Sequence, residues 1–400
     1  MYSNSVRQAL PLVPPAILLF ALTLTGTIAL RLLMLLIAVG IAAYTWRTQG
    51  GQKPPCLAAW AIWTLVAAFS LIGAADLAYS LREMKSEIGY SLLIFLVFFV
   101  LTRDRARLEL WAGTLLVAFW VISIAGTLAS ENGKWVSGRW GGVGDYSTIL
   151  VELMPLLGLL YFTTRERSRG RVTRLVDVLA LATVALALGT AYLSNNRMVW
   201  ITFAVMAIGF FIFITRKLST TLVLVGGLTI TLAFGAVLAT AAAKGLLSAW
   251  TVDDVGELFA QDERIVHWTN VVPKILDNPI QGSGFGRASM YKAYPELRVF
   301  GSLWHAHNLA LDVAVQMGIP GVIALILLLG CPARHLWRLL SNPDPLLRAV
   351  GITGLLLIVA VLTKNMTDDF FARHHAMLFW AQIGMLLGLA SHRQARAGAT

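Results

Sequence analysis

Charge and cysteine are both scarce in this sequence. Charged residues make up 13% of the 400 positions and hydrophobic residues 57%, whereas soluble domains are about 25% charged. The alternating apolar and polar pattern of a membrane β-barrel is absent as well. With only two cysteines, Cys56 and Cys331, a disulfide framework is excluded, and we expect free thiols because both lie near helix ends predicted to face the cytoplasm. These absences leave an all-α, polytopic integral membrane protein.

Apolar runs of roughly 18 to 22 residues recur along the chain, which is the length that a helix needs to cross a bilayer. Backbone polar groups in lipid must bond within their own segment, so each run is predicted to be a helix. The first run follows Arg7 without a convincing cleavage site, and we expect a retained span rather than a signal peptide. The twelve predicted spans cover residues 9–25, 28–46, 57–74, 87–101, 109–128, 146–163, 173–193, 197–214, 219–240, 308–330, 346–363 and 375–390.

Basic residues gather in alternate short loops, for example at 103–107 and 165–174, and most acids lie on the opposite side. This distribution places both termini in the cytoplasm. Residues 1–240 then hold transmembrane helices 1–9, residues 241–306 form a long outer loop that acts as a lid, and residues 307–400 hold transmembrane helices 10–12 and a cytoplasmic tail. Within the loop, residues 262–268 predict the start of an amphipathic helix. Its expected apolar face is interrupted by Pro273 and comprises Ile265, Trp268, Val272 and Ile275.

The formal net charge of +11 raises the question of a nucleic-acid partner. The excess positive charge lies in short loops between spans, as the positive-inside rule describes. We therefore expect membrane lipids, and no nucleic acid, as partners.

Residues 304–308 close the long loop and contain two histidines, His305 and His307. Histidine has the unperturbed pKa nearest to neutral pH, which suits it to take a proton from a hydroxyl. Asn308 is placed to cap the following helix, and Asp312, one turn into that helix, to serve the same site. The spacing alone equally fits interfacial histidines with local hydrogen bonds. A metal site is not expected, because no further ligand stands at a suitable spacing in the sequence.

Three outward arginines, Arg139, Arg197 and Arg264, are candidates for binding an anionic group. The guanidinium group stays charged and binds phosphate oxygens through two hydrogen bonds. Each also has an explanation without a ligand. Arg139 would lie in a solvated turn, Arg197 would extend its side chain to the membrane interface, and Arg264 would form an ion pair. In the last outer loop, Asp368 and Asp369 are placed to orient a catalytic imidazole or to bind sugar hydroxyls, and a solvated loop with internal salt bridges would explain them equally.

Taken together, these segments resemble the lipopolysaccharide O-antigen ligases, within the wider group of O-antigen ligases and polymerases. The resemblance covers most of the chain. Its features are about twelve spans, one long loop late in the chain, the His-x-His-Asn-Leu segment that closes the loop, residues 262–264, the Asn-Pro turn at 278–282 with Gly284, residues 316–321, and Asn196-Arg197. This set of motifs does not separate ligases from polymerases.

The resemblance implies a glycosyltransferase in the bacterial inner membrane, which transfers O-antigen polysaccharide from undecaprenyl pyrophosphate to the lipid A core on the periplasmic face. It implies no metal and no other cofactor. The family's histidine precedes Asn, so the general base maps to His307, with His305 beside it. The pyrophosphate-binding arginines map to Arg197 and Arg264, and more loosely to Arg139. Direct attack activated by one base predicts inversion at the anomeric carbon.

Two other functions remain open at this stage. An O-antigen polymerase or a protein O-oligosaccharyltransferase would use the same donor with a different acceptor. A lipid-linked glycan transporter belongs to another class and would place charged residues deep in its helices, whereas the distinctive polar residues here gather on one face. The sequence also leaves open whether Arg287, Arg298 or Arg373 makes the phosphate contacts instead.

Overall fold

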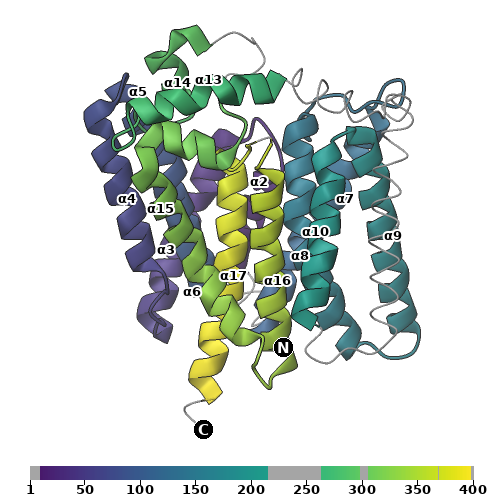
Figure 1. Ribbon diagram of the computed structural model, residues 1–400. Coiled ribbons are helices and arrows are strands. Elements are labelled where there is room, and N and C mark those ends of the chain that lie inside the picture. Colours follow the sequence, from purple (N-terminus) through teal and green to yellow (C-terminus); the bar gives the residue numbers. More distant parts are fainter. Residues whose placement is uncertain (1–9, 215–262, 298–304, 368, 398–400) are drawn as a thin grey trace.

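The computed structural model describes residues 10–214, 263–297, 305–367 and 369–397, and in these ranges the chain forms a bundle of long helices (Figure 1). In chain order the elements are η1 (Leu10–Leu12), α2 (Val13–Leu22), α3 (Ile28–Gln49), α4 (Leu57–Ser70), η2 (Leu71–Gly73), α5 (Leu77–Glu83), the π-helix η3 (Met84–Gly89), α6 (Tyr90–Leu101), α7 (Arg105–Leu128), α8 (Val143–Arg167), α9 (Arg171–Ser194), α10 (Arg197–Ile214), α13 (Glu263–Asp277), α14 (Ser289–Ala293), η5 (Pro295–Leu297), α15 (Leu309–Leu339), α16 (Pro345–Lys364) and α17 (Arg373–Ala397).

Eight helices in the described ranges are long and apolar enough to cross a membrane, and two shorter apolar helices, Leu10–Leu22 and Leu57–Gly73, accompany them. The expected multi-pass, all-α architecture is thus confirmed. Every predicted span except one coincides with a described helix; the exception, 219–240, lies outside the described residues. The count of twelve spans and the orientation of the termini stay predictions.

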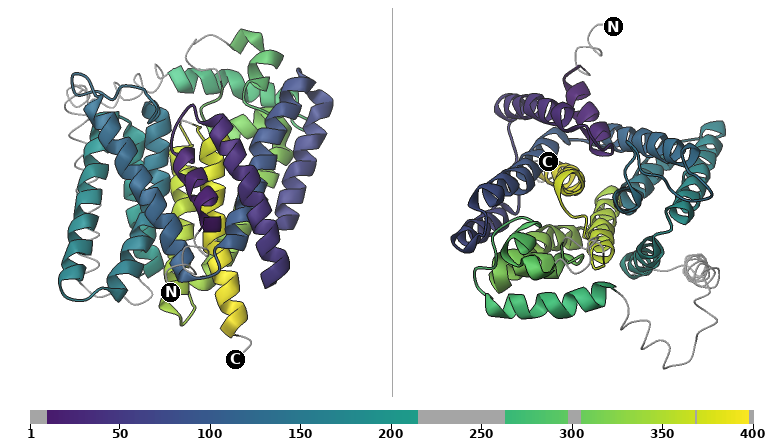
Figure 2. Two further views of the ribbon diagram at one scale, coloured as in Figure 1. Left: turned by 180° about the vertical axis from the view of Figure 1, so that it is seen from behind. Right: turned by 90° about the horizontal axis from the view of Figure 1, so that it is seen from above.

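Helix α17 runs through the middle of the bundle, as the view from above shows (Figure 2). It packs closely on α6 because two glycines spaced four apart, Gly384 and Gly388, remove the side chains that would separate the backbones. A Cβ atom on Gly384 would lie 2.5 Å from the carbonyl oxygen of Phe95, and one on Gly388 would lie 2.3 Å from that of Phe99. Small residues at this spacing are a common device for packing helices inside membranes.

The expectation of free thiols is wrong, because Cys56 and Cys331 form a disulfide. Cys56 immediately precedes α4, and Cys331 lies in the second half of α15, which packs along α4. Their Cα atoms are 5.7 Å apart, although 275 positions separate them in the chain. That distance falls in the ordinary range for a disulfide, and only the packing of these two helices brings the pair together.

The long helix α15 is broken near its start. Gly318 has a φ of 65°, outside the helical region, and Pro320 has no N–H to donate to the preceding turn. A Cβ atom on Gly318 would lie 2.4 Å from the carbonyl oxygen of Pro279. The N–H of Ile319 donates to that same oxygen at 2.8 Å, so a loop residue takes the place of a helical partner.

A glycine-rich turn at residues 282–286 docks onto this break. The N–H of Ser283 donates to the carbonyl of Val315 at 2.8 Å, and the N–H of Gly284 donates to that of Gln316 at 3.1 Å. The break leaves these two carbonyls without their usual helical donors, so the turn completes the hydrogen bonding of the helix. The docked turn also fixes the position of the next residue, Arg287.

Helix α13 lies across one end of the bundle, and the C-terminal end of α17 lies at the opposite end (Figure 1). The helix continues through Pro273 instead of being interrupted there. Its buried residues are His267, Val271 and Ile275. Val272, predicted to belong to the buried face, is 41% exposed, because the docked face is rotated by about one residue, or 100°.

Candidate functional site

The histidine segment is fixed to the start of α15 by Asn308. The Asn308 side-chain oxygen accepts from the N–H groups of Ala310 and Leu311 at 3.0 and 3.1 Å, which confirms the predicted N-cap. Its amide group donates to the carbonyl of Met366 at 2.8 Å. The cap therefore also ties the segment to the loop between α16 and α17.

His305 is buried and held by a carboxylate. Its Nδ1 atom lies 2.9 Å from Oδ2 of Asp312, and Oδ1 of the same carboxylate accepts from the N–H of Ala306 at 2.8 Å. His305 is 2% exposed. With both carboxylate oxygens engaged in this way, the first helical turn of α15 fixes the orientation of the His305 ring.

His307 is less deeply buried and has a backbone conformation that is unusual for a residue with a side chain. Its φ is 51°, and strain of this kind costs about 1–3 kcal/mol and is concentrated at functional sites. The conformation turns its ring onto that of His305, with the ring centroids 3.9 Å apart and the planes inclined by 17°. His305 thus supports the ring of His307.

Helix α13 contacts this segment directly. The indole Nε1 of Trp268 donates to the carbonyl of Ala306, between the two histidines, at 2.7 Å. Arg264 stands four residues before Trp268 and so lies on the same side of the helix. Of the predicted arginines, Arg264 is the one carried by an element that touches the histidine segment.

Asp369 and Arg287 complete the cluster around His305. Nε of Arg287 lies 3.4 Å from Oδ2 of Asp369. Burial raises the pKa of Asp369, an effect that the Arg287 guanidinium opposes. Burial likewise disfavours the charge on Arg287, but Asp369 and Asp312 outweigh this effect and raise its pKa. The neighbouring Asp368 lies outside the described residues.

One atom each of His305, Asp312 and Asp369 lies within 4.8 Å of the others, a spacing that could hold a cation. In this structure the imidazole faces Asp312, and the guanidinium of Arg287 pairs with Asp369. The guanidinium of Arg287 therefore already balances the negative charge of Asp369. The expectation that the protein needs no metal stays a prediction.

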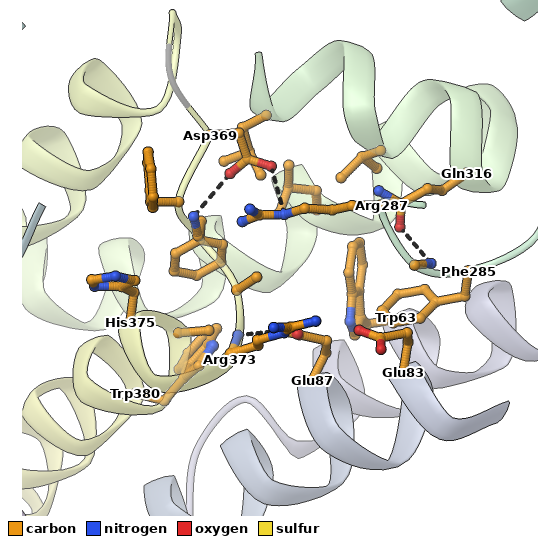
Figure 3. A pocket seen from close by; sticks show the side chains of 18 of the residues that line it. Trp63, Glu83, Glu87, Phe285, Arg287, Gln316, Asp369, Arg373, His375 and Trp380 are labelled. Carbon is orange, nitrogen blue, oxygen red and sulfur yellow. Dashed lines mark hydrogen bonds and ion pairs between the residues drawn. The ribbon is translucent and has the colours of Figure 1, made fainter. Parts of the chain in front are cut away.

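A cavity of about 230 Å³ adjoins the cluster. Arg287 and Asp369 belong to its wall, and Leu309, the residue after the helix cap, lines it too. Figure 3 shows Arg287 and Asp369 along one edge of the cavity and Glu83 and Glu87 along another. The remaining wall is largely aromatic, with side chains that include Trp60, Trp63, Phe285, Phe370, Phe371 and Trp380.

Arg139 and Arg197 do not line this cavity in the part of the chain that the structure describes. Arg139 is exposed; its carbonyl accepts from the N–H of Thr25 and its guanidinium approaches Gly26. Arg197 is the exposed first residue of α10. The arginine beside the histidine cluster is Arg287, which the sequence offered only as one of three alternatives; Arg298 lies outside the described residues.

Asp369 was a predicted site residue, but the other acids of the cavity and its aromatic residues were not predicted. Trp63, Glu83 and Glu87 belong to segments that the sequence marks as ordinary apolar helices or their edges. One signal was available, because Glu83 and Glu87 stand four residues apart beside an apolar span, where unpaired acids are costly.

Comparison with known families agrees with the resemblance drawn from the motifs. The family model described as O-antigen ligase matches residues 182–326, a stretch that includes Arg197, Arg264, Arg287 and both histidines. A search of curated proteins found no match. The resemblance is thus confirmed over the segment 182–326, which is similar to the O-antigen ligase family.

Proposed function

We propose that the protein is an O-antigen ligase that transfers a glycan from undecaprenyl pyrophosphate to a sugar hydroxyl of the lipid A core, on the periplasmic face of the inner membrane. The family match supports the coarser assignment, a membrane glycosyltransferase of the ligase and polymerase type. The observation that carries the finer proposal is the strained, half-buried His307, whose ring rests on a carboxylate-anchored His305.

In this proposal His307 takes the proton of the acceptor hydroxyl as its oxygen attacks the anomeric carbon. The bond from that carbon to the pyrophosphate breaks, and undecaprenyl pyrophosphate leaves with the electron pair. General-base catalysis of this kind is worth about 10²–10⁴ in rate. His305 is a positioning residue, because it is 2% exposed and acts through the ring that it supports.

The leaving pyrophosphate is a weak base, so it needs positive charge more than it needs a proton. Arg264 is the best-supported candidate for this role, since α13 is hydrogen-bonded to the histidine segment through Trp268. Arg197 and Arg139 remain candidates for the same role. Replacement of Arg197 by Lys is expected to impair transfer, because an ammonium group does not reproduce the paired hydrogen bonds of a guanidinium.

The test is transfer by purified protein with a defined donor, in the presence of a chelator. We expect His307→Ala to abolish product formation at normal protein level. His335→Ala is the matched control, because His335 lies 28 residues further along α15, about 40 Å away. Transfer by the His307→Ala variant at near the wild-type rate would exclude His307 as the base.

Supplying lipid A-core, a glycan repeat or an acceptor protein in separate reactions distinguishes a ligase from a polymerase or a protein glycosyltransferase. Retention of the anomeric configuration between donor and product would exclude a single displacement. Translocation of a fluorescent donor into vesicles by the His307→Ala variant would favour a transporter instead.

A further inference from the structure

The cavity beside the histidine cluster has polar groups that the proposed reaction does not use. Glu83 and Glu87 lie at the end of α5 and in the π-helical segment that follows, where the wider turn brings both to the cavity wall. Short π-helical segments inside helices frequently occur at functional sites. Oε2 of Glu87 accepts from the N–H of Arg373 at 2.7 Å, so this carboxylate is oriented by the loop before α17.

The aromatic residues of the cavity provide flat faces next to these acids. Trp63 and Phe285 are 8% and 5% exposed, and their rings meet edge to face with centroids 6.2 Å apart. Trp380 lines the cavity from α17. A sugar ring presents C–H groups on its faces and hydroxyl groups around its edge. It therefore suits a site with aromatic faces and carboxylate oxygens close together, since pockets combine apolar walls with a few oriented polar groups.

The balance of charge in the wall selects between a sugar and a phosphate. Four carboxyl groups line the cavity, those of Glu83, Glu87, Asp145 and Asp369, against two guanidinium groups, those of Arg287 and Arg373, and two imidazoles, those of His374 and His375. The guanidinium of Arg287 is already paired with Asp369. A pyrophosphate would meet a surplus of negative charge here, whereas an uncharged ligand rich in hydroxyl groups would find acceptors and donors without repulsion.

Size and position agree with this choice. The cavity volume of about 230 Å³ is several times the roughly 30 Å³ that one water molecule takes in the liquid, which leaves room for a sugar ring. Arg287 and Asp369 belong both to this cavity and to the cluster that holds His305. A ring bound in the cavity would therefore lie next to the histidines.

We propose that this cavity is a subsite for one uncharged sugar ring, which packs on Trp63 and Phe285 and donates hydroxyl hydrogen bonds to Glu83 and Glu87. The assignment of that ring to a substrate rests on the proposed transfer reaction, because both the acceptor and the first residue of the donor glycan carry such a ring. Binding of a sugar does not depend on the reaction and can be measured separately.

The first experiment measures binding alone. Purified protein in nanodiscs is mixed with methyl glucoside or methyl N-acetylglucosaminide, and binding is followed by saturation-transfer NMR. We expect Glu87→Gln and Trp63→Leu to weaken binding about tenfold, as loss of a charge-assisted hydrogen bond or an aromatic face predicts. Glu131→Gln, which changes an exposed acid in the loop after α7, should bind as the wild type does, and thermal unfolding checks that each variant is folded.

Two results of this experiment would overturn the proposal. The first is unchanged sugar binding in both variants while they remain folded, which would place the ring elsewhere. The second is displacement of the sugar from wild-type protein by inorganic pyrophosphate, together with tighter binding of pyrophosphate by the Glu87→Gln variant. That outcome would identify the cavity as a phosphate site.

The second experiment uses the transfer reaction to identify the source of the ring. A rise in KM for lipid A-core in the Glu87→Gln variant assigns the subsite to the acceptor, and a rise in KM for the lipid-linked donor assigns it to the donor. A fall in kcat with both KM values unchanged would contradict a binding role. If wild-type protein transfers nothing, the proposed function fails, and the NMR result still decides the sugar subsite.

Discussion

The contact between Asp312 and His305 gives the sharpest test of how the site is organised. Replacing Asp312 by Asn keeps the shape of the side chain and one oxygen to accept from the N–H of Ala306. It removes the charged oxygen that lies 2.9 Å from Nδ1 of His305. The ring of His305 then loses its charged partner, and the ring of His307, which stacks on it with the centroids 3.9 Å apart, is held less firmly.

The magnitude follows from the energy of that contact. A hydrogen bond to a charged group contributes about 1.5–3 kcal/mol. If this energy serves to orient His307 for proton transfer, its loss lowers kcat by about 10- to 150-fold. KM should change little, because neither Asp312 nor His305 lies in the cavity wall.

Initial rates of glycan transfer by purified protein, measured over a range of acceptor concentrations, separate kcat from KM. Asp277→Asn is the matched control, since Asp277 is the exposed last residue of α13. A folded Asp312→Asn variant with kcat within about twofold of the wild type would show that the carboxylate does not position the histidines, and the reasoning would be refuted.

Three further predictions concern the scaffold. Gly388→Ala should destabilise the protein by about 1–3 kcal/mol, because the added Cβ meets the backbone of Phe99 at 2.3 Å; thermal unfolding should show a lower Tm than for Gly330→Ala, whose Cβ meets nothing within 4 Å. Gly318→Ala should lower the free energy of unfolding by a similar amount, because Gly318 has a φ of 65°. It should also expose residues 278–286 to protease. Unchanged digestion would contradict the docking of this turn on α15. Burial lowers the pKa of His267 from its ordinary value of 6.5, so the unfolded chain binds protons more readily than the folded one. Docking of α13 should therefore hold above that pH and weaken below it. Hydrogen exchange of residues 263–277 between about pH 8 and about pH 5 measures this, and the same dependence in His267→Gln would rule out His267 as its cause.

The sequence could predict the helices and the histidine segment because their signals are local. Apolar runs of bilayer length marked the spans, and Asn308, directly before the apolar run that follows the loop, marked the cap. The rotation of α13 was not predicted. Its sequence has apolar residues on more than one side, and only docking on α15 decides which of Val271 and Val272 is buried.

The cavity and the disulfide depend on contacts between distant parts of the chain. Arg373 orients Glu87 across 286 positions, and Cys56 meets Cys331 across 275. No periodicity within a single segment reports such pairs. Arg287 is an intermediate case. The glycines before it predicted a turn, but only the docking of that turn on the break in α15 shows where the guanidinium lies.

The break in α15 also bears on how the protein is made. Pro279, Ser283 and Gly284 leave the ribosome before the residues that they bond, which lie between Val315 and Ile319. During synthesis the turn therefore lacks these partners in α15 until the following helix has emerged and entered the bilayer. Assembly of the polar region around Arg287 must then wait for membrane insertion of the segment downstream of it, so a nascent chain stalled before residue 315 would carry both histidines and still lack the site.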